Sequence, residues 1–387
     1  MTIVVIAGAL ANKPFYGGAA WTRLSWALGL KRLGFDVYFL EQIAREHCRD
    51  ASGARAEFET CTGRLYFDRV MAQFGLGDAA SLILENGEQV HGLVLRQLHE
   101  LAGACALLVN ISGHLAWPPL FKRFRRRAYV DLDPGYTQFW HASGHPGLRL
   151  EGHDLYFTVG ENIGTPACSL PTAEIRWRPI RQPVVLEHWP VAGIGALEAD
   201  RFTTVASWRG SYGPISRDGV TYGPKAHEFR RFLPLPEAAR QKFEIALDVD
   251  PADGGDLDRL QAHGWRIVDP RNVAGDPDAF RCYVQASAAE FSAAQGMYVQ
   301  TGCGWVADRT VRYLASGKPA LVQDTGFSRN YPTGAGLIPF RTFEQAVAGA
   351  DHIGCDYDWH SRAARDLAEA YFDSDKVLAR FVEECGL

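Results

Sequence analysis

The sequence predicts an α/β protein made of two Rossmann-like, doubly wound domains that face each other across a cleft. Segments typical of strands and helices alternate along the chain, which is the pattern of parallel sheets covered by helices. The length of 387 residues exceeds what one hydrophobic core usually organises. Proline and tryptophan become dense in residues 175–190, which indicates a boundary between two such domains.

The first half supplies the expected elements of one sheet. The apolar run 3–7 predicts a buried strand, and the loop 8–18 leads into a helix over 20–33. The further elements expected here are strands at 37–40, 106–111, 128–132 and 155–159, and a helix over 88–102. We therefore expect residues 1–190 to form an N-terminal domain.

The second half repeats this pattern and predicts a C-terminal domain over residues 200–360. The elements expected here are strands at 202–207, 243–247, 265–268 and 320–322, a loop over 208–224, a helix from Lys225 and a helix over 308–315. The tail 361–387 has helical apolar spacing. We expect this helix to pack back on the N-terminal domain.

Composition and charge exclude several classes of protein. A net charge of −5 argues against a chain-wide nucleic-acid surface, which would need a basic excess. The eight cysteines form no C-x-x-C pair, so neither a zinc ribbon nor a disulfide framework is indicated, and a cytoplasmic location is expected. The basic run 122–127 is a local exception, for which we consider a solvated face or a peripheral contact with an anionic membrane.

Residues 302–327, GCGWVADRTVRYLASGKPALVQDTGF, are the most informative stretch of the chain. Gly302 and Gly304 allow a tight turn, and the first turn of the following helix presents unpaired N–H groups to a phosphate. The expected strand 320–322 ends at polar residues, and such strand exits bind ligands in open α/β sheets. These polar residues are Gln323, Asp324 and Thr325.

Two Rossmann-like halves, a Gly-Gly turn after the first strand and this segment resemble the glycosyltransferases of GT-B architecture. In the natural-product members a similar segment reads H-C-G-W, then a glutamate, then G-x-P and finally D-Q. This chain has Cys303-Gly304-Trp305, Gly317-x-Pro319 and the reversed pair Gln323-Asp324. The resemblance implies a nucleotide-sugar donor, with UDP or dTDP as the expected carrier.

The chain departs from the family segments at identifiable positions. Gly302 stands where the natural-product enzymes have a histidine that faces the donor diphosphate, and their glutamate falls near Asp308 or Arg309. In the glycogen-synthase-like branch a similar segment begins E-x-F-G, which Glu290-Phe291 could match, and Arg312 stands where the second glutamate should be. The sequence therefore lies between the two branches.

A donor site of this kind needs positive charge, because the diphosphate leaving group becomes more negative as the glycosidic bond breaks. Arg209 and Lys225 offer cations after the first strand of the second half, with solvated surface charge as the alternative. Asp269 ends a strand and is expected near the nucleotide base, or in a turn. The predicted donor residues are Arg209, Lys225, Asp269, Glu290, Gly302, Gly304, Trp305, Asp308, Gln323, Asp324 and Thr325.

The acceptor must lose a proton, so we look for a general base near the cleft. Asp131 and Asp133 end the strand 128–132, and their spacing of two places both carboxylates on one side of a strand. Two close carboxylates raise each other's pKa, which favours a base near neutral pH; capping of the next turn is the alternative. His114, in a Ser-Gly-His turn, is the rival base or a structural histidine.

The acceptor pocket is expected to combine a glycine turn with aromatic side chains. Its predicted residues are Gly17, Gly18, Tyr136, Trp140 and His141. His141, His145 and His153 are close enough to suggest a metal site, but intervening glycines argue against the helix that would align them. We expect no metal and no cofactor besides the nucleotide-sugar co-substrate.

These patterns favour a metal-independent glycosyltransferase that moves a sugar from a nucleoside-diphosphate sugar to a small-molecule or lipid acceptor. The donor binds to residues 200–360 and the acceptor mainly to the first domain, and the presence of candidate bases favours inversion. The alternatives are a nucleotide-sugar epimerase or hydrolase of the same fold and a non-catalytic nucleotide-sugar-binding protein. A dinucleotide-dependent dehydrogenase is disfavoured, because the first turn lacks G-x-G-x-x-G. The oligomeric state is not indicated.

Overall fold

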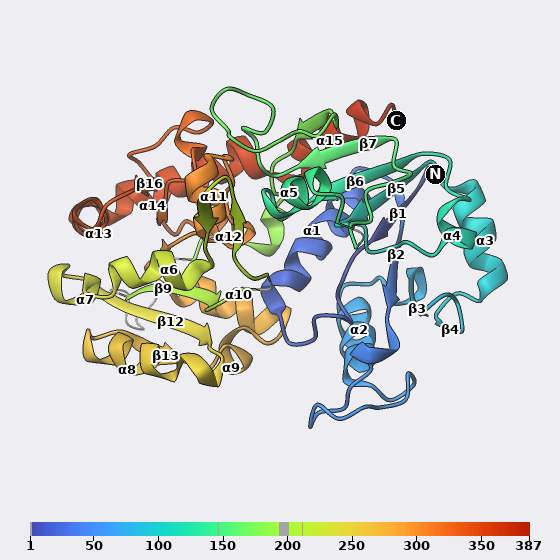
Figure 1. Cartoon of the computed structure of the whole chain (residues 1–387), viewed down its shortest axis with the longest axis horizontal. Coiled ribbons are helices and arrows are strands. Elements are labelled where there is room, and N and C mark those ends of the chain that lie inside the picture. The colour runs from blue at the N-terminus through green and yellow to red at the C-terminus, as the bar shows by residue number, and fades with distance from the viewer. Residues whose placement is uncertain (1, 146, 193–200, 211) are drawn as a thin grey trace.

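The two halves of the chain form two parallel β-sheets that lie side by side (Figure 1). The structure is a computed structural model that describes residues 2–145, 147–192, 201–210 and 212–387. Strands up to residue 179 belong to the first sheet and strands from residue 201 to the second. Residues 193–200, which follow the predicted boundary at 175–190, lie outside the described residues.

The first sheet has the order β4-β3-β2-β1-β5-β6-β7-β8, and its neighbours pair in parallel except for β3 with β4. The chain moves outward from β1 in one direction and restarts at β5 on its other side, which is the doubly wound order. Its strands are β1 Ile3–Ala7, β2 Asp36–Ile43, β3 Ala80–Leu84, β4 Gln89–His91, β5 Leu107–Ile111, β6 Arg127–Asp131, β7 Leu155–Thr158 and β8 Trp177–Pro179.

The second sheet has the order β13-β12-β9-β14-β15-β16 and is parallel throughout. Counted from its own first strand this is 3-2-1-4-5-6, the order of the Rossmann fold. Its strands are β9 Arg201–Ser207, β12 Lys242–Asp248, β13 Arg266–Val268, β14 Ala289–Ser292, β15 Ala320–Gln323 and β16 Leu337–Phe340. A separate hairpin is formed by β10 Ile215–Arg217 and β11 Val220–Tyr222.

Helices cover both faces of each sheet. The helices of the first half are α1 Gly17–Arg32, α2 Thr62–Gln73, α3 Leu95–Ala104, α4 Pro118–Phe121 and α5 Tyr136–Ala142. Those of the second half are α6 Lys225–Phe229, α7 Leu235–Ala238, α8 Gly254–Ala262, α9 Pro270–Ala274, α10 Pro277–Ala286, α11 Gly296–Thr301, α12 Asp308–Ala315 and α13 Phe343–Cys355. The chain ends with α14 Tyr357–Leu367, a π-helical segment Ala368–Phe372 and α15 Ser374–Glu384.

The central strand β1 shows why helices pack on both faces of the first sheet. Its side chains alternate, so Val4 and Ile6 enter the apolar cluster of α1 and α2, whereas Val5 enters the cluster of α3 and α4. The cluster around Val4 also contains Val311 of α12 and Val322 of β15. One apolar core therefore continues from the first half into the second.

The C-terminal helices connect the two halves (Figure 1). Helix α14 packs against α12 of the second half, and α15 returns to α1 of the first. The Phe381 ring lies 5.0 Å from the Trp26 ring and 4.7 Å from the Phe157 ring, measured between centroids. The tail that the sequence predicts as one helix is thus two helices with a π-helical join.

The predicted fold class is confirmed, while some elements differ. The helix predicted over 88–102 begins at Leu95, because residues 89–91 instead pair antiparallel with β3. The predicted loop 208–224 contains the hairpin β10–β11. The domain bounds 1–190 and 200–360 stay a prediction. Within the described residues no helix is both long and apolar enough to cross a membrane.

Candidate active site

A cavity of about 630 Å³ lies where the carboxyl ends of strands from both sheets face each other. One wall comes from residues 13–19 after β1 and from Leu132 and Asp133 after β6. The other comes from the ends of β9, β12 and β13 and from the start of α12. Carboxyl edges of doubly wound sheets are where ligands bind, so this cavity is the candidate active site.

Some of the predicted site residues line this cavity and others do not. Those that line it are Gly17, Gly18, Asp133, Asp269, Trp305 and Asp308. Asp269 also accepts a hydrogen bond at 2.8 Å from the backbone N–H of Arg271 and so caps α9. Near it, Leu247, Val249 and Ile267 give this end of the cavity an apolar character.

The Asp133 carboxylate is free to act in the cavity. Among the described residues it has no hydrogen-bond partner of its own, although its backbone N–H is bonded. Burial raises the pKa of Asp133, and the positive charges of Lys13 and Arg23 oppose that rise. A carboxylate that is costly to ionise and faces a cavity has the properties of a general base.

Asp131 differs from Asp133 although the two are only two residues apart. Its buried carboxylate accepts hydrogen bonds from Thr137 Oγ1 at 2.7 Å, Gln138 Nε2 at 2.9 Å and Thr158 Oγ1 at 2.8 Å. It also accepts the backbone N–H of Asp133 at 3.1 Å. The two carboxylates therefore do not share one side: β6 ends at Asp131, and Asp131 holds the start of α5 in place.

His114, the rival base, does not line the cavity. Burial lowers its pKa to about 3, and the positive charges of Arg23, Lys13 and Arg149 add to this. The imidazole is therefore neutral at neutral pH but surrounded by cations, which makes it a poor proton acceptor.

Arg309, at the start of α12, is the most firmly held cation of the cavity. Its Nε donates to Glu290 Oε1 at 2.7 Å and its Nη2 to Ser292 Oγ at 2.8 Å, both on β14. Its Nη1 donates to the backbone oxygen of Val205 at 2.6 Å. The buried Glu290 thus acts on the site through Arg309. A guanidinium fixed in this way is preorganised to face a developing negative charge.

Lys225 lies beside this pair without lining the cavity. Burial lowers its pKa to about 7, the charge of Arg309 lowers it further, and Glu290 and Asp308 oppose the change. Asp308 itself accepts a hydrogen bond from Thr22 Oγ1 of α1 at 2.6 Å, which joins the two halves at the cavity floor. An anion bound near Lys225 would favour its charged form.

Lys13, Arg23 and Arg271 also line the cavity with positive charge, and none of the three was predicted from the sequence. The loop that carries Lys13 is held by the buried carboxylate of Glu41, which accepts the backbone N–H groups of Leu10 at 2.8 Å, Ala11 at 2.6 Å and Asn12 at 2.8 Å. The signal that could have identified Arg23 is its position among the mainly apolar residues in the middle of helix α1, where a charged side chain needs a partner.

Arg209 lies away from the cavity. Its side chain is exposed and pairs with Asp253, with Nε 2.6 Å from Oδ2. The glycine-rich loop places this arginine on the surface. This agrees with the alternative given for Arg209, a solvated surface charge. Arg309 of α12, and not Arg209, lines the cavity at this edge of the sheet.

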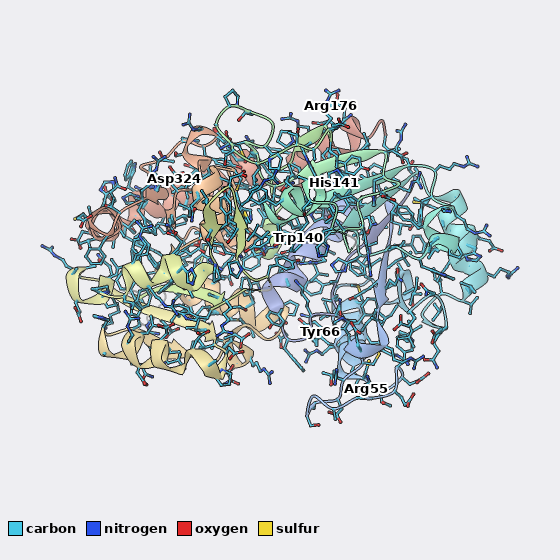
Figure 2. All side chains as sticks on the ribbon, in the orientation of Figure 1. Arg55, Tyr66, Trp140, His141, Arg176 and Asp324 are labelled. Carbon is cyan, nitrogen blue, oxygen red and sulfur yellow. The ribbon has the colours of Figure 1, made fainter. Side chains whose placement is uncertain are left out.

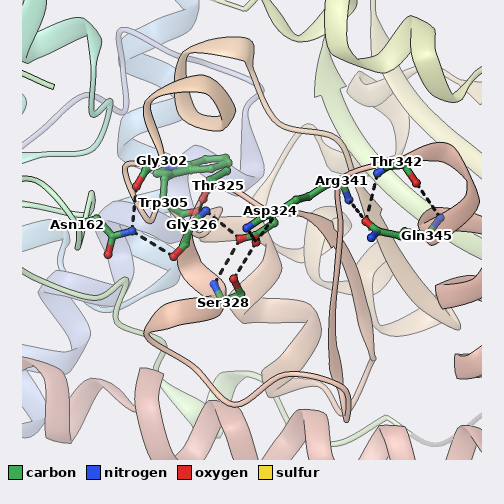
Figure 3. A network of polar contacts seen from close by, with 10 residues as sticks. All are labelled: Asn162, Gly302, Trp305, Asp324, Thr325, Gly326, Ser328, Arg341, Thr342 and Gln345. Atoms are coloured by element: carbon green, nitrogen blue, oxygen red, sulfur yellow. Dashed lines mark hydrogen bonds and ion pairs between the residues drawn. The ribbon is translucent and has the colours of Figure 1, made fainter. Parts of the chain in front are cut away.

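The polar residues at the end of β15 are bonded to other parts of the protein, as Figure 3 shows for Asp324 and Thr325. Gln323 is buried between Glu228 Oε2, at 2.7 Å from its Nε2, and the backbone N–H of Ala294, at 3.0 Å from its Oε1. Asp324 pairs with Arg341 at 2.7 Å, and Thr325 donates to the Trp305 backbone oxygen at 2.6 Å. These groups support the turn, and none of the three lines the cavity.

The Gly302–Gly304 turn packs against the first half of the chain (Figure 3). Asn162 Nδ2 donates to the backbone oxygens of Gly302 at 2.9 Å and Gly326 at 3.1 Å. The φ angles of Gly302 and Gly304 are 63° and 79°, and a Cβ on Gly304 would lie 2.8 Å from the Asn162 side chain. The turn therefore serves contact between the halves, and only Trp305 and the start of α12 reach the cavity.

The predicted acceptor aromatics lie at the junction of the halves and outside the cavity (Figure 2). Tyr136 is buried and donates from its hydroxyl to Gln295 Oε1 at 2.7 Å. Its ring and that of Trp140 lie 4.9 and 4.8 Å from the Tyr212 ring. His141 follows on the same helix, and none of the three lines the cavity.

The three histidines do not form a metal site. His153 is buried, with Nδ1 2.9 Å from the Leu150 backbone oxygen and Nε2 3.0 Å from Asn110 Nδ2. Across the described part of the chain, no group of three or more His, Cys, Asp or Glu side chains is arranged to hold a metal ion.

No protein-family model and no curated protein matches the chain. Solved structures do. An alpha-glucosyltransferase in complex with UDP and a 13-mer DNA is 10% identical, with a TM-score of 0.61 and full coverage of both chains. Anabaena HepE in complex with UDP and glucose is 11% identical, with a TM-score of 0.57 and full coverage of both chains.

A sucrose-phosphate synthase from Thermosynechococcus elongatus is 13% identical, with a TM-score of 0.55, and covers 99% of this chain and 98% of its own. At such low identities, the TM-scores of 0.55 to 0.61 show similarity of fold alone. Both sheets, their strand orders and the cleft between them agree with that result. The chain therefore has the GT-B fold, the fold of the glycosyltransferases that it resembles.

Proposed function

We propose that the protein is a glycosyltransferase that moves a sugar from a UDP-sugar to a small-molecule or lipid acceptor without a metal ion. The observation that carries this proposal is one cleft between two Rossmann-like sheets in which the free carboxylate of Asp133 faces several cations. These cations are Lys13, Arg23 and Arg309. The alpha-glucosyltransferase and HepE structures of the same fold hold UDP, which supports UDP as the carrier.

The cavity suggests an order for the parts of the donor. The nucleoside lies at the ends of β12 and β13, where apolar side chains and Asp269 form the wall. The diphosphate lies at the start of α12, where Arg309 and Lys225 balance its charge. These two side chains supply the positive charge that a metal ion would otherwise provide. The sugar then points toward Asp133 on the opposite wall.

The proposed reaction transfers one proton and one glycosyl group. Asp133 takes the proton of the acceptor hydroxyl while the hydroxyl oxygen forms a bond to the anomeric carbon. The bond from that carbon to the diphosphate oxygen breaks, and its electron pair stays on UDP. Attack from the face opposite UDP inverts the anomeric configuration, so the anomer of the product tests this step.

Binding of the nucleotide is tested first, by thermal-shift titration with uridine, thymidine, guanosine and adenosine diphosphates. We expect UDP to raise the melting temperature most, and calorimetry to show about tenfold weaker UDP binding by Lys225→Met, as expected for loss of one charge-assisted contact. Arg209→Met is the matched control and keeps normal affinity, because Arg209 is exposed and pairs with Asp253, whereas Lys225 is close to Arg309 of the cavity. Stability unchanged by all four nucleotides would overturn the donor site.

Turnover then separates the alternatives. Release of UDP from a UDP-sugar with no acceptor present would favour an epimerase or hydrolase of the same fold. Binding of UDP without turnover on any small-molecule or lipid acceptor would favour a non-catalytic nucleotide-sugar-binding protein. Activity that disappears with EDTA and returns with a divalent cation would contradict metal independence.

A further inference from the structure

A surface at the far end of the first half combines exposed apolar and basic side chains. It is formed by the start of α3, by α4 and by the residues after α4, and it lies at the right edge of Figure 1, away from the second sheet. We call it the α3–α4 surface. Its members are Val94, Leu95, Arg96, Pro118, Pro119, Lys122, Arg123 and Arg125, all of them exposed.

The apolar members are not part of the core. Val94 is 58% exposed and Leu95 is 39% exposed, and the two are adjacent in the chain. Helix α3 already packs on the sheet through Leu98 and Leu101, two buried residues of the next turns. Much of the apolar surface at 94 and 95 therefore stays outside the core, and a contact outside this chain would explain it.

The basic members keep their charges available. Within the described ranges, Lys122, Arg123 and Arg125 make no ion pair, and Arg96 pairs only with Glu100 of the same helix at 3.6 Å. The last two cations of the run are used inside the protein: Arg126 bonds to the backbone oxygen of Cys385, and Arg127 lies 3.4 Å from Asp154.

Apolar and basic side chains of the α3–α4 surface meet in one place. Leu95, Arg96 and His99 of α3 line one shallow depression together with Arg123. Glu100 lies in the same depression and is the one acidic side chain there. Because Glu100 is balanced by Arg96, the charges of Lys122, Arg123 and Arg125 give the surface its net positive sign.

We propose that the α3–α4 surface docks the protein on an anionic lipid bilayer. Exposed lysine and arginine side chains are attracted to the negative headgroups, and each strengthens binding by about fivefold near such a surface. Val94 and Leu95 then enter the boundary of the acyl chains. A nucleic acid would use the cations alone and leave both apolar side chains in water, so the lipid surface explains more of what is exposed.

The docking site is separate from the cavity, and the two share no lining residue. Binding to lipid can therefore be measured whether or not the protein transfers sugar. It would hold the first half, which carries Asp133, against the membrane while the second half stays free to receive a nucleotide.

The test is co-sedimentation of the whole chain with vesicles of equal parts phosphatidylcholine and phosphatidylglycerol, and with vesicles of phosphatidylcholine alone. We expect binding to the anionic vesicles only. The variant Lys122→Gln/Arg123→Gln should bind them about 30-fold more weakly, from about fivefold for each charge. Val94→Ser/Leu95→Ser should bind about tenfold more weakly with its charge unchanged.

The matched control is Arg55→Gln/Arg176→Gln, which removes two exposed charges far from the α3–α4 surface (Figure 2). It should bind as the unchanged protein does. The proposal is overturned if neither variant binds the anionic vesicles more weakly than this control does. It is also overturned if the unchanged protein does not co-sediment with the anionic vesicles. It is also overturned if Lys122→Gln/Arg123→Gln weakens binding of the protein to duplex DNA while Val94→Ser/Leu95→Ser leaves vesicle binding unaltered.

Discussion

Replacing Asp133 by asparagine should lower activity, whereas replacing Asp131 by asparagine should lower stability. Asp133→Asn removes the proposed base and should lower kcat by about 10²- to 10⁴-fold. It should not destabilise the fold, because burial makes the charged form of Asp133 costly and the carboxylate has no hydrogen-bond partner among the described residues. The matched variant Asp131→Asn keeps the cavity wall and disturbs only the support behind it.

The cost of Asp131→Asn follows from its four donors. The hydroxyls of Thr137 and Thr158 can rotate away, but the amide of Gln138 and the backbone N–H of Asp133 cannot. Asparagine offers one acceptor oxygen where the carboxylate offers two, so at least one buried donor loses its partner. That loss is worth about 1–3 kcal/mol of unfolding free energy.

The pH dependence gives a second check. The folded chain holds a proton on Asp133 more tightly than the unfolded chain does, because its pKa is raised from the ordinary value of 3.8. The Asp133 contribution to unfolding free energy therefore falls as pH rises from that value through the raised pKa. Urea denaturation at about pH 4 and about pH 7 should show a smaller fall for Asp133→Asn than for the unchanged protein.

Steady-state rates and urea denaturation of both variants decide the matter. The reasoning is refuted if Asp133→Asn keeps full activity, or if Asp131→Asn is as stable as the unchanged protein. A large loss of activity in Asp131→Asn with unchanged stability would move the base from Asp133 to Asp131.

Three further predictions concern the cavity and its supports. Because the Lys225 pKa is lowered to about 7, UDP should bind more weakly as pH rises from about 6 to about 9, and calorimetry in two buffers should detect proton uptake on binding. Glu41→Gln leaves at least one of three backbone N–H groups without its acceptor and should lower unfolding free energy by about 1–3 kcal/mol in urea denaturation; full stability would contradict this account. Gly304→Ala should cost about 1–3 kcal/mol, because φ is 79° and Asn162 lies in the way, whereas Gly103→Ala, in a helix with open space, should gain about 0.5–1 kcal/mol; equal melting temperatures would argue against strain at Gly304.

Local patterns were sufficient for the fold because they depend on residues near in sequence. The strand β1 matches the predicted run 3–7, and α12 matches the predicted helix 308–315. Where a short segment had no strong period, the prediction was wrong: residues 89–91 form β4 because β3 is available as a partner, and no local property of those residues requires it.

The site was only partly predictable. Asp133, Asp269 and Asp308 follow strands or begin a helix, and all three line the cavity. Gln323 and Asp324 end a strand at the same edge, yet Glu228 and Arg341 bind them, and these partners come from remote parts of the chain.

The sequence by itself determined two doubly wound sheets and the edge at which their loops meet, since periodicity and turn residues act over a few positions. Only the tertiary structure decided which side chains at that edge stay free. The Asp133 carboxylate has no hydrogen bond or ion pair among the described residues, whereas the Asp131 carboxylate is bonded by Thr158 and the Arg209 guanidinium is paired with Asp253. Such pairing depends on approach in space, which local sequence does not contain.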